Sequence, residues 1–262
     1  MRPVIALLTD FGSSDHYAGT MKGVMLEICG EATLVDITHD VPPQDILGGA
    51  LELAASYSYF PPGTIFLVVV DPGVGSARRG IAVGAGGYRF VAPDNGLVSL
   101  VIGDGPAEAF EITNPQYALH PISRTFEGRD RFAPAAAWLA AGAEIASCGA
   151  RIEDIVRIAL PEAREMDSAV EGEVVHVDRF GNLVTNISAG ALDRFADGAA
   201  LEVTVAGRSK MSVASTYAEI GRGSVGALIG STGHLELSVG GGSAASALGC
   251  GRGTAVRVAR RA

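Results

Sequence analysis

The chain has 262 residues, of which 48% are hydrophobic and 19% are charged, a balance that excludes global intrinsic disorder. Its length corresponds to one large domain or two modest ones. With 20 basic and 29 acidic residues the formal net charge is −9 and no basic stripe is visible, which argues against a nucleic-acid partner.

In the first half of the chain, continuous apolar strands alternate with helical patterns. Helices are predicted at His16–Cys29, Gln44–Tyr59 and Phe132–Ala143, and Ser13, Ser14 and Asp15 are capping candidates for the first. Strands are predicted at Val4–Thr9, Ala32–Ile37, Thr64–Val70, Gly80–Ala85 and Arg89–Ala92. This alternation indicates a mainly parallel sheet covered on both faces, and we expect an α/β sandwich domain over residues 1–160.

Short segments of alternating polar and apolar residues follow, separated by glycine-rich turns. They are Gly172–Asp178, Asn182–Ile187, Ala200–Ala206, Ser224–Ile229, His234–Val239 and Thr254–Arg260. This pattern is typical of an antiparallel barrel or sandwich. The charged stretch Pro161–Ser168 is the candidate linker, and we expect a second, all-β domain over residues 170–262.

Targeting segments and metal sites leave no signature. No apolar run approaches the roughly 20 residues that cross a bilayer, and the run Val4–Thr9 is too short for a signal peptide. Cys29, Cys148 and Cys250 are odd in number and match no metal spacing, so we interpret them as thiols in a reducing compartment. The five histidines form no metal-binding array. We expect a cytoplasmic protein with no membrane partner and no metal.

Several predicted strands end in an aspartate or in a turn that carries one. These residues are Asp10, Asp36, Asp71 and Asp94. Because ligands of open α/β sheets bind beyond the carboxyl ends of the strands, the set indicates a functional edge. Taken singly, each aspartate is equally well explained by turn formation.

The segment Val70–Arg79 reads VDPGVGSARR and combines an acid, two glycines and an arginine. Pro72 biases Asp71 towards an extended conformation, and the glycines allow a tight loop that approaches a ligand closely. Arg78 can fold back towards Asp71 and form a polarising pair. The alternative is a structural loop with a surface salt bridge. The spacing fits neither a dinucleotide-binding fingerprint nor a P-loop.

Charged and aromatic residues are interleaved in Arg124–Phe132, just before a predicted helix. Flexible Gly128 would allow Glu127 to reach a site, and the residues alone leave that role of Glu127 open. For Asp130 we favour a helix start, where an acid interacts with free backbone amides.

Two stretches of the second half carry groups suited to a small ligand. In the turn around Gly181, Phe180 offers an aromatic face, Asn182 an amide for a nucleobase edge and Asp178 a carboxylate for an amine; a simple hairpin is the alternative. Backbone amides that can receive an anion or a purine, or else plain turns, are expected in Gly230–Gly233 and Gly240–Ala245.

Taken in order, these segments resemble the S-adenosylmethionine hydrolase (adenosine-forming) family, which is related to the fluorinases and chlorinases. The matching motifs are LLTDFG…MKG, VDPGVGS, PDNGL, TFEGRDRFAPAAA, VDRFGNLVTNI and GSTGHLEL…GSAA, and they cover nearly the whole chain. The resemblance implies an N-terminal α/β domain, a C-terminal antiparallel β-barrel domain and a homotrimer with sites between subunits. It also implies that methionine is displaced from ribose C5′ of S-adenosyl-L-methionine, by water or by halide, without a cofactor.

The resemblance assigns roles by position. It implies that Asp10 holds the ribose hydroxyls, that Asp178 pairs with the methionine ammonium and that Asn182 reads adenine. Ser231 and the backbone near Gly241 match contacts to the methionine carboxylate and to adenine. Phe180 completes the substrate-binding set.

Asp71 and Arg78 match two members of the Asp-Arg-His set of the hydrolases. Halogenases lack that aspartate, so the pair favours water as the nucleophile. The family motif TFHGRD reads TFEGRD here, and Glu127 stands in place of the histidine. A carboxylate at this position can accept a proton or orient water, and we include it with the catalytic residues.

Three other functions remain open at this point. The protein could be a halogenase that uses S-adenosylmethionine, or, because of Glu127, a sensor that binds adenosine or S-adenosylmethionine without turnover. The opening LLTDFGSSD also resembles that of the metal-dependent stationary-phase survival nucleotidases, although Phe11 replaces the second acid that would bind a metal.

Overall fold

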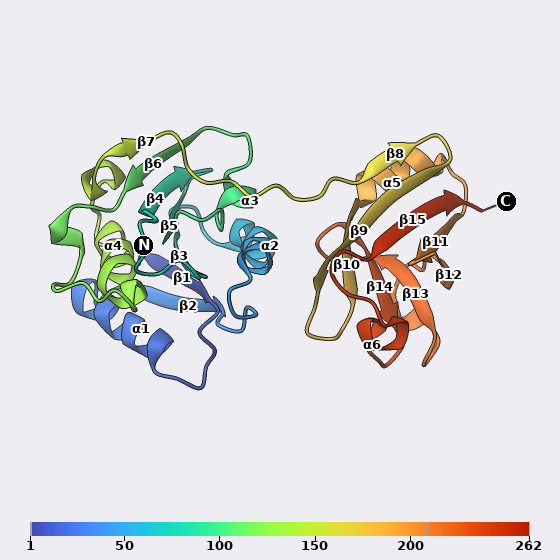
Figure 1. Ribbon diagram of the computed structural model, residues 1–262, viewed down its shortest axis with the longest axis horizontal. Helices are drawn as coiled ribbons and strands as arrows, with labels where there is room; N and C mark the ends of the chain where they lie inside the picture. The colour runs from blue at the N-terminus through green and yellow to red at the C-terminus, as the bar shows by residue number, and fades with distance from the viewer. Residues whose placement is uncertain (1, 208, 262) are drawn as a thin grey trace. The chain divides into compact units, whose positions relative to one another are not determined.

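A computed structural model describes residues 2–207 and 209–261, and the chain divides into two compact units (Figure 1). The first unit is Met1–Ala159 and the second is Leu160–Ala262. Each unit has a hydrophobic core of its own.

The first unit is built on a seven-stranded sheet with the order β2-β1-β3-β5-β4-β6-β7. Neighbours among β2, β1, β3 and β5 are parallel, whereas the pairs β5–β4, β4–β6 and β6–β7 are antiparallel. The strands are β1 (Val4–Thr9), β2 (Thr33–Thr38), β3 (Ile65–Val69), β4 (Gly80–Ala85), β5 (Tyr88–Pro93), β6 (Ala107–Glu111) and β7 (Arg151–Ile152).

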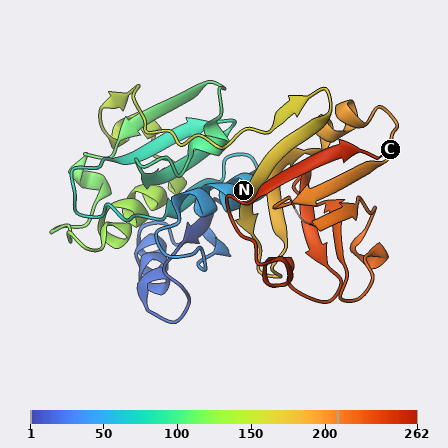
Figure 2. The ribbon, with the colours of Figure 1, turned by 45° about the vertical axis from the view of Figure 1, so that its right-hand side comes forward.

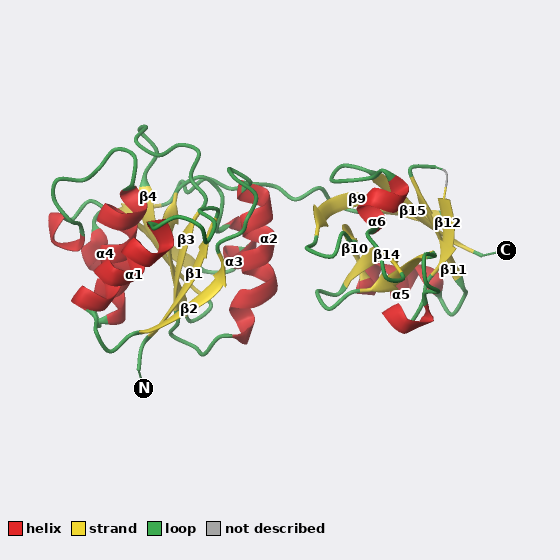
Figure 3. Cartoon of the chain, turned by 90° about the horizontal axis from the view of Figure 1, so that it is seen from below, coloured by secondary structure: helices red, strands yellow, loops and turns green. Residues whose placement is uncertain are grey.

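Helices cover both faces of this sheet, as the sequence predicts. Figure 3 shows α1 (Tyr17–Ile28) and α4 (Ala133–Ala140) on one side, and α2 (Ile46–Ser56) and α3 (Ser99–Ile102) on the other. In β1, Leu7 packs in the core on the α1 and α4 side, and its neighbour Leu8 packs in the core with α2 and α3. Buried strands with apolar residues on both faces are expected of a three-layer α/β sandwich.

The antiparallel part of the sheet arises from a two-residue turn. Gly86 and Gly87 join β4 to β5 and have φ angles of 59° and 83°. Positive φ at both central residues defines the type I′ turn of a tight hairpin, so β4 and β5 pair directly without a crossover helix. The sequence analysis missed β6 and the edge strand β7, which have only five and two residues.

Irregular helices complete the first unit. They are the 3₁₀-helices Tyr57–Tyr59, Pro115–Tyr117 and Ile145–Cys148, and the π-helix Gly128–Phe132. The predicted caps of α1 are wrong: His16 occupies the N-cap position, with no side-chain hydrogen bond to the helix.

The second unit is an eight-stranded antiparallel sheet that curls into a nearly closed barrel (Figure 2). Its main order is β12-β11-β15-β9-β10-β14-β13, and a bridge between Val213 and Ala227 draws the two ends together. The strands are β8 (Arg164–Met166), β9 (Ala169–Val177), β10 (Leu183–Ser188), β11 (Leu201–Val205), β12 (Ser209–Ser212), β13 (Val225–Ile229), β14 (His234–Val239) and β15 (Ala255–Arg260). The predicted antiparallel β domain is confirmed.

Short helices flank this barrel: α5 (Ala189–Ala196), α6 (Ala244–Leu248) and the 3₁₀-helix Tyr217–Glu219. The expected linker Pro161–Ser168 is partly wrong, because Arg164–Met166 forms strand β8 and pairs with β9. Among the residues that the structure describes, no helix is long and apolar enough to cross a membrane.

Candidate active site

Two of the four strand-end aspartates meet at the carboxyl edge of the parallel strands. Thr9 of β1 pairs in register with Val69 of β3, so Asp10 and Asp71 follow neighbouring strands. Burial raises the pKa of Asp10, the Gln44 amide opposes this by donating a 2.7 Å hydrogen bond, and the charge of Asp71 raises the pKa further. Asp10 therefore lies close enough to Asp71 to be affected by its charge.

Gln44 has a φ of 68°, a backbone conformation that residues other than glycine rarely adopt. This backbone geometry turns its N–H towards Asp10. No sequence pattern marked Gln44 as part of the edge.

Arg78 folds back onto Asp71, as the sequence predicts. Its Nε donates to Asp71 Oδ1 at 2.9 Å and its Nη2 donates to Asp71 Oδ2, so the pair is bidentate. The side chains are only 10% and 6% exposed, and Arg78 lies over the Phe132 ring at 5.1 Å. A surface salt bridge is thereby excluded, because this pair is buried and oriented by two hydrogen bonds.

The glycine loop is held against a distant segment. Gly75 has a φ of 75°, and a Cβ placed on it would lie 2.3 Å from the carbonyl oxygen of Arg124. Gly75 therefore lies close against the backbone of Arg124, and the approach of this loop to a ligand stays a prediction. That contact docks residues 71–79 against the segment that carries Glu127.

Glu127 joins the pair from this second segment. Its Oε2 lies 3.1 Å from Arg78 Nη2 and 3.4 Å from Arg131 Nε, and the residue is only 6% exposed. The expectation of a flexible Gly128 is wrong. Gly128 is buried in a π-helix, where a Cβ would lie 2.9 Å from Met21 Sδ.

The other aspartates singled out in the sequence of this unit have partners outside the Asp71–Arg78 pair. Asp130 lies in the first turn of the π-helix that leads into α4, as the predicted helix start requires, and its carboxylate accepts hydrogen bonds from Arg129 and the Ser123 amide. Asp94 is buried and pairs with Arg79 at 2.6 Å. Asp36 lies within β2 and accepts hydrogen bonds from Lys22 and His39.

An aromatic cluster lies close to the edge and was also missed. Phe11 follows Asp10, and Tyr17 and Phe126 pack with it at ring distances of 5.8 and 6.1 Å. Phe126 directly precedes Glu127, so the cluster contains the chain neighbours of both Asp10 and Glu127.

In the second unit, a tight turn organises the predicted polar residues. Asp178 Oδ1 accepts the Phe180 and Asn182 amides, and Asp178 Oδ2 accepts Asn182 Nδ2 at 2.8 Å. Asn182 is buried, whereas Phe180 is 76% exposed. Gly181 has a φ of 82°, and a Cβ there would collide with Ser243 at the start of α6.

Ser231 and Gly241 lie at opposite ends of β14. Ser231 is exposed in the turn before this strand, and Gly241, with a φ of 73°, follows it. Since a strand rises about 3.3 Å per residue, the six residues of β14 separate them by roughly 17–20 Å. A ligand that touches both has to be elongated.

A buried acid within β14 was not singled out in the sequence. Glu236 accepts hydrogen bonds from Tyr217 Oη at 2.5 Å and Ser238 Oγ at 3.1 Å. Burial, together with Glu236 and Asp178, raises the pKa of Tyr217 to about 12, so the phenol is a donor at neutral pH. No group of three or more His, Cys, Asp or Glu side chains within the described ranges is arranged to hold a metal ion.

The cysteines are free thiols with different burial. Cys29 and Cys148 are buried, and Cys250 is partly exposed. Burial raises the pKa of Cys148 to about 11, which makes it unreactive at neutral pH.

Fold and site together define a two-domain protein whose α/β domain carries a buried acid–arginine–acid cluster beyond its parallel strands. Models of the SAM hydroxide adenosyltransferase N-terminal and C-terminal domains match residues 5–149 and 172–257. The chain belongs to this family, and the resemblance found in its motifs is confirmed.

Relatives of known name match along almost the full chain. An (R)-S-adenosyl-L-methionine hydrolase from Thermus thermophilus is 40% identical, covering 98% of this chain and 100% of its own length. A second hydrolase, from Salinispora tropica, is 37% identical over 98% of this chain and 97% of its own. A fluorinase from Nocardia brasiliensis is more distant, at 32% identity over 90% of each chain.

A solved structure supports the fold. The crystal structure of an uncharacterized conserved protein from Thermotoga maritima matches with a TM-score of 0.88 and 35% identity, covering 98% of this chain and 100% of that one.

Proposed function

We propose that this protein hydrolyses S-adenosyl-L-methionine to adenosine and L-methionine. The observation that carries the proposal is the buried, bidentate Asp71–Arg78 pair with Glu127 on the same guanidinium. It lies in a chain that is 40% identical to a named hydrolase along almost its whole length.

The reaction is a single displacement at ribose C5′. A water oxygen attacks C5′ while the C5′–S bond breaks, and the electron pair passes to sulfur and neutralises the sulfonium. Because the sulfonium is already a good leaving group, the proposal requires no bound cofactor and no acid at sulfur. The protein has to hold a water in line with the C5′–S bond and accept one proton.

The cluster in the first unit has the groups for both tasks. Asp71 and Arg78 orient the water, since each is fixed by the other and both are buried. Glu127 accepts the proton that the attacking water loses. Asp10, on the neighbouring strand, binds the ribose hydroxyls.

In the second unit we propose that Asp178 binds the methionine ammonium and Asn182 the adenine edge. Ser231 and the backbone at Gly241 bind the methionine carboxylate and adenine, and exposed Phe180 packs against the nucleoside. The separation of Ser231 and Gly241 along β14 suits a ligand as long as this one. Following the family resemblance, we propose a homotrimer in which two subunits complete each site.

Product analysis in isotopic water tests the function. Purified protein is incubated with S-adenosyl-L-methionine in H₂¹⁸O, with and without fluoride or chloride, and the products are identified by chromatography and mass spectrometry. We expect methionine and adenosine with one ¹⁸O on the 5′ oxygen, whether or not halide is present. A 5′-halogenated nucleoside would contradict hydrolysis in favour of halogenation, and tight binding without product would indicate a sensor.

Activity after treatment with EDTA distinguishes hydrolysis of S-adenosyl-L-methionine from the remaining alternative, a metal-dependent nucleotidase. Unchanged turnover is expected of the displacement described above. Loss with EDTA and recovery with a divalent ion would support the metal-dependent nucleotidase instead.

A further inference from the structure

Glu127 is held between two guanidinium groups. Its Oε2 lies 3.1 Å from Arg78 Nη2 and 3.4 Å from Arg131 Nε. Both Glu127 Oε2 and Arg131 Nε are buried, and neither makes a directed hydrogen bond within the described residues. The contact between them is therefore a pairing of charges.

Arg131 is placed by the packing of its stem. It lies four residues after Glu127 in the π-helix, and a Cβ added at Gly80 would come within 2.9 Å of its Cδ. The absence of a side chain at the first residue of β4 thus makes room for Arg131 to reach Glu127.

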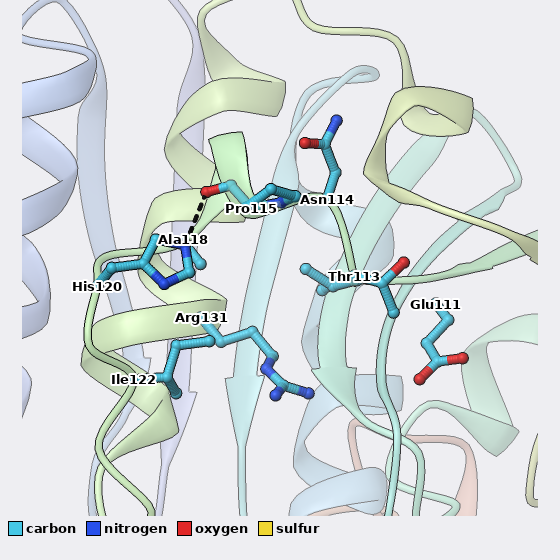
Figure 4. A pocket seen from close by; sticks show the side chains of 9 residues that line it. Glu111, Thr113, Asn114, Pro115, Ala118, His120, Ile122 and Arg131 are labelled. Atoms are coloured by element: carbon cyan, nitrogen blue, oxygen red, sulfur yellow. Dashed lines mark hydrogen bonds between the residues drawn. The ribbon is translucent and has the colours of Figure 1, made fainter.

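The far side of Arg131 faces a pocket of about 230 Å³. Figure 4 shows its guanidinium among the residues that line this pocket, including Glu111, Thr113 and His120. Glu127 is the charged partner that the described contacts give Arg131. The side chain therefore has one ionic contact on the cluster side and space on the other.

The charges of the cluster require a second cation. Asp71 and Glu127 carry two negative charges against the single positive charge of Arg78, which already gives two hydrogen bonds to Asp71. Asp10, close to Asp71, adds further negative potential. A buried carboxylate without enough positive charge nearby takes up a proton or turns to solvent, and in either state it accepts no proton from water.

We propose that Arg131 is a positioning residue, which supplies the charge that keeps the Glu127 carboxylate in place beside Arg78 and ready to accept the proton. Arg131 acts through Glu127 and does not touch the substrate. The inference rests on the proposed hydrolysis and explains how a carboxylate functions where the family motif has histidine.

Kinetics of two variants test the proposal. Arg131→Met keeps most of the side-chain length and removes the charge, so we expect kcat to fall by about tenfold or more with KM for S-adenosyl-L-methionine within about twofold. Arg131→Lys keeps the charge and should recover much of kcat. Arg194→Met, which removes an exposed ion pair with Glu165, is the matched control and should retain wild-type kcat.

A double-mutant cycle separates positioning from a general structural role. In a Glu127→Gln background, Arg131→Met should cause little further loss of kcat, because the carboxylate through which Arg131 acts is already absent. Full additivity of the two losses would overturn the proposal, as would wild-type kcat in Arg131→Met. If Arg131→Met fails to fold by circular dichroism, Arg131→Gln takes its place in both measurements.

The two proposals fail in different ways. If wild-type protein makes no adenosine from S-adenosyl-L-methionine, the proposed function is wrong. If wild-type protein makes adenosine and the folded Arg131 variants do so at the same rate, only the role of Arg131 is wrong.

Discussion

Asp71 is fixed on both carboxylate oxygens by one guanidinium, and the pair is buried. Under the proposed mechanism Asp71 orients the attacking water and does not bind the rest of the substrate. We therefore expect Asp71→Ala to lower kcat by about 100-fold or more while KM changes by less than about threefold. Steady-state assays of adenosine formation measure both.

Asp71→Asn is the companion variant, because it preserves volume and removes the charge that Arg78 balances. It should also be strongly impaired. Near-normal kcat in Asp71→Ala would remove Asp71 from the catalytic step.

At the residue scale, the seven-residue spacing from Asp71 to Arg78 was enough to predict their contact, because the loop between them is short and contains two glycines. The same reasoning left the role of Glu127 open, because its partner Arg78 is 49 residues away in the chain. The strand-end pattern alone also could not separate Asp10 from Asp94, and only the family resemblance assigned Asp10 to the site. Both follow parallel strands, but Arg79 and the Val156 amide occupy the Asp94 carboxylate.

At the scale of elements, the contact of the glycine loop with Arg124 assembles the cluster. Gly75→Ala places a Cβ 2.3 Å from the Arg124 carbonyl oxygen in a left-handed backbone. We expect a loss of about 1–3 kcal/mol in the free energy of unfolding and a clear fall in kcat, since the Glu127 segment is pushed away. Chemical denaturation and steady-state kinetics measure the two effects.

Gly87→Ala is the matched control, because Gly87 has a φ of 83° with no atom within 4 Å of an added Cβ. It should cost about 1–2 kcal/mol through backbone strain and leave kcat unchanged. Equal kcat in the Gly75 and Gly87 variants would contradict a role for the loop contact in the site.

Helices and strands were predicted correctly where their apolar residues recur at the spacing of that helix or strand. The bounds of β1, β4 and β14 agree with the sequence prediction to the residue, and α1 agrees to within one residue at each end. The sequence analysis missed strands β6, β7, β8 and β12 and helices α3, α5 and α6. Short edge strands gain their stability from a neighbour rather than from their own pattern, so periodicity says little about them.

At the scale of the whole molecule, buried acids make folding stability depend on pH. Burial would raise the pKa of Asp130, but hydrogen bonds from Arg129 and the Ser123 amide outweigh it and lower the pKa. A lowered pKa adds stability that is complete above the unfolded value and is lost as pH falls through the folded value. We expect the free energy of unfolding to drop below about pH 4.

Asp130→Asn tests this assignment in urea denaturation at pH 7, 5, 4 and 3. The variant should lose about 1–3 kcal/mol at pH 7 and show a smaller further fall below pH 4. Asp104→Asn, at an exposed aspartate, is the control and should behave like wild type. An unchanged acid dependence in Asp130→Asn would refute the contribution of Asp130.

The two kinds of architecture, the Asp71–Arg78 pair and, through the ordered motifs, the family were predictable from the amino-acid sequence. These features depend on local periodicity and on short spacings, which a single chain displays directly. The folded structure was needed to show that Gly75 contacts Arg124, that Gly128 is packed rather than flexible, and that Glu127 lies between Arg78 and Arg131. Those contacts join segments far apart in the chain, and their energies come from close packing and buried charge, which leave no repeating pattern in the sequence.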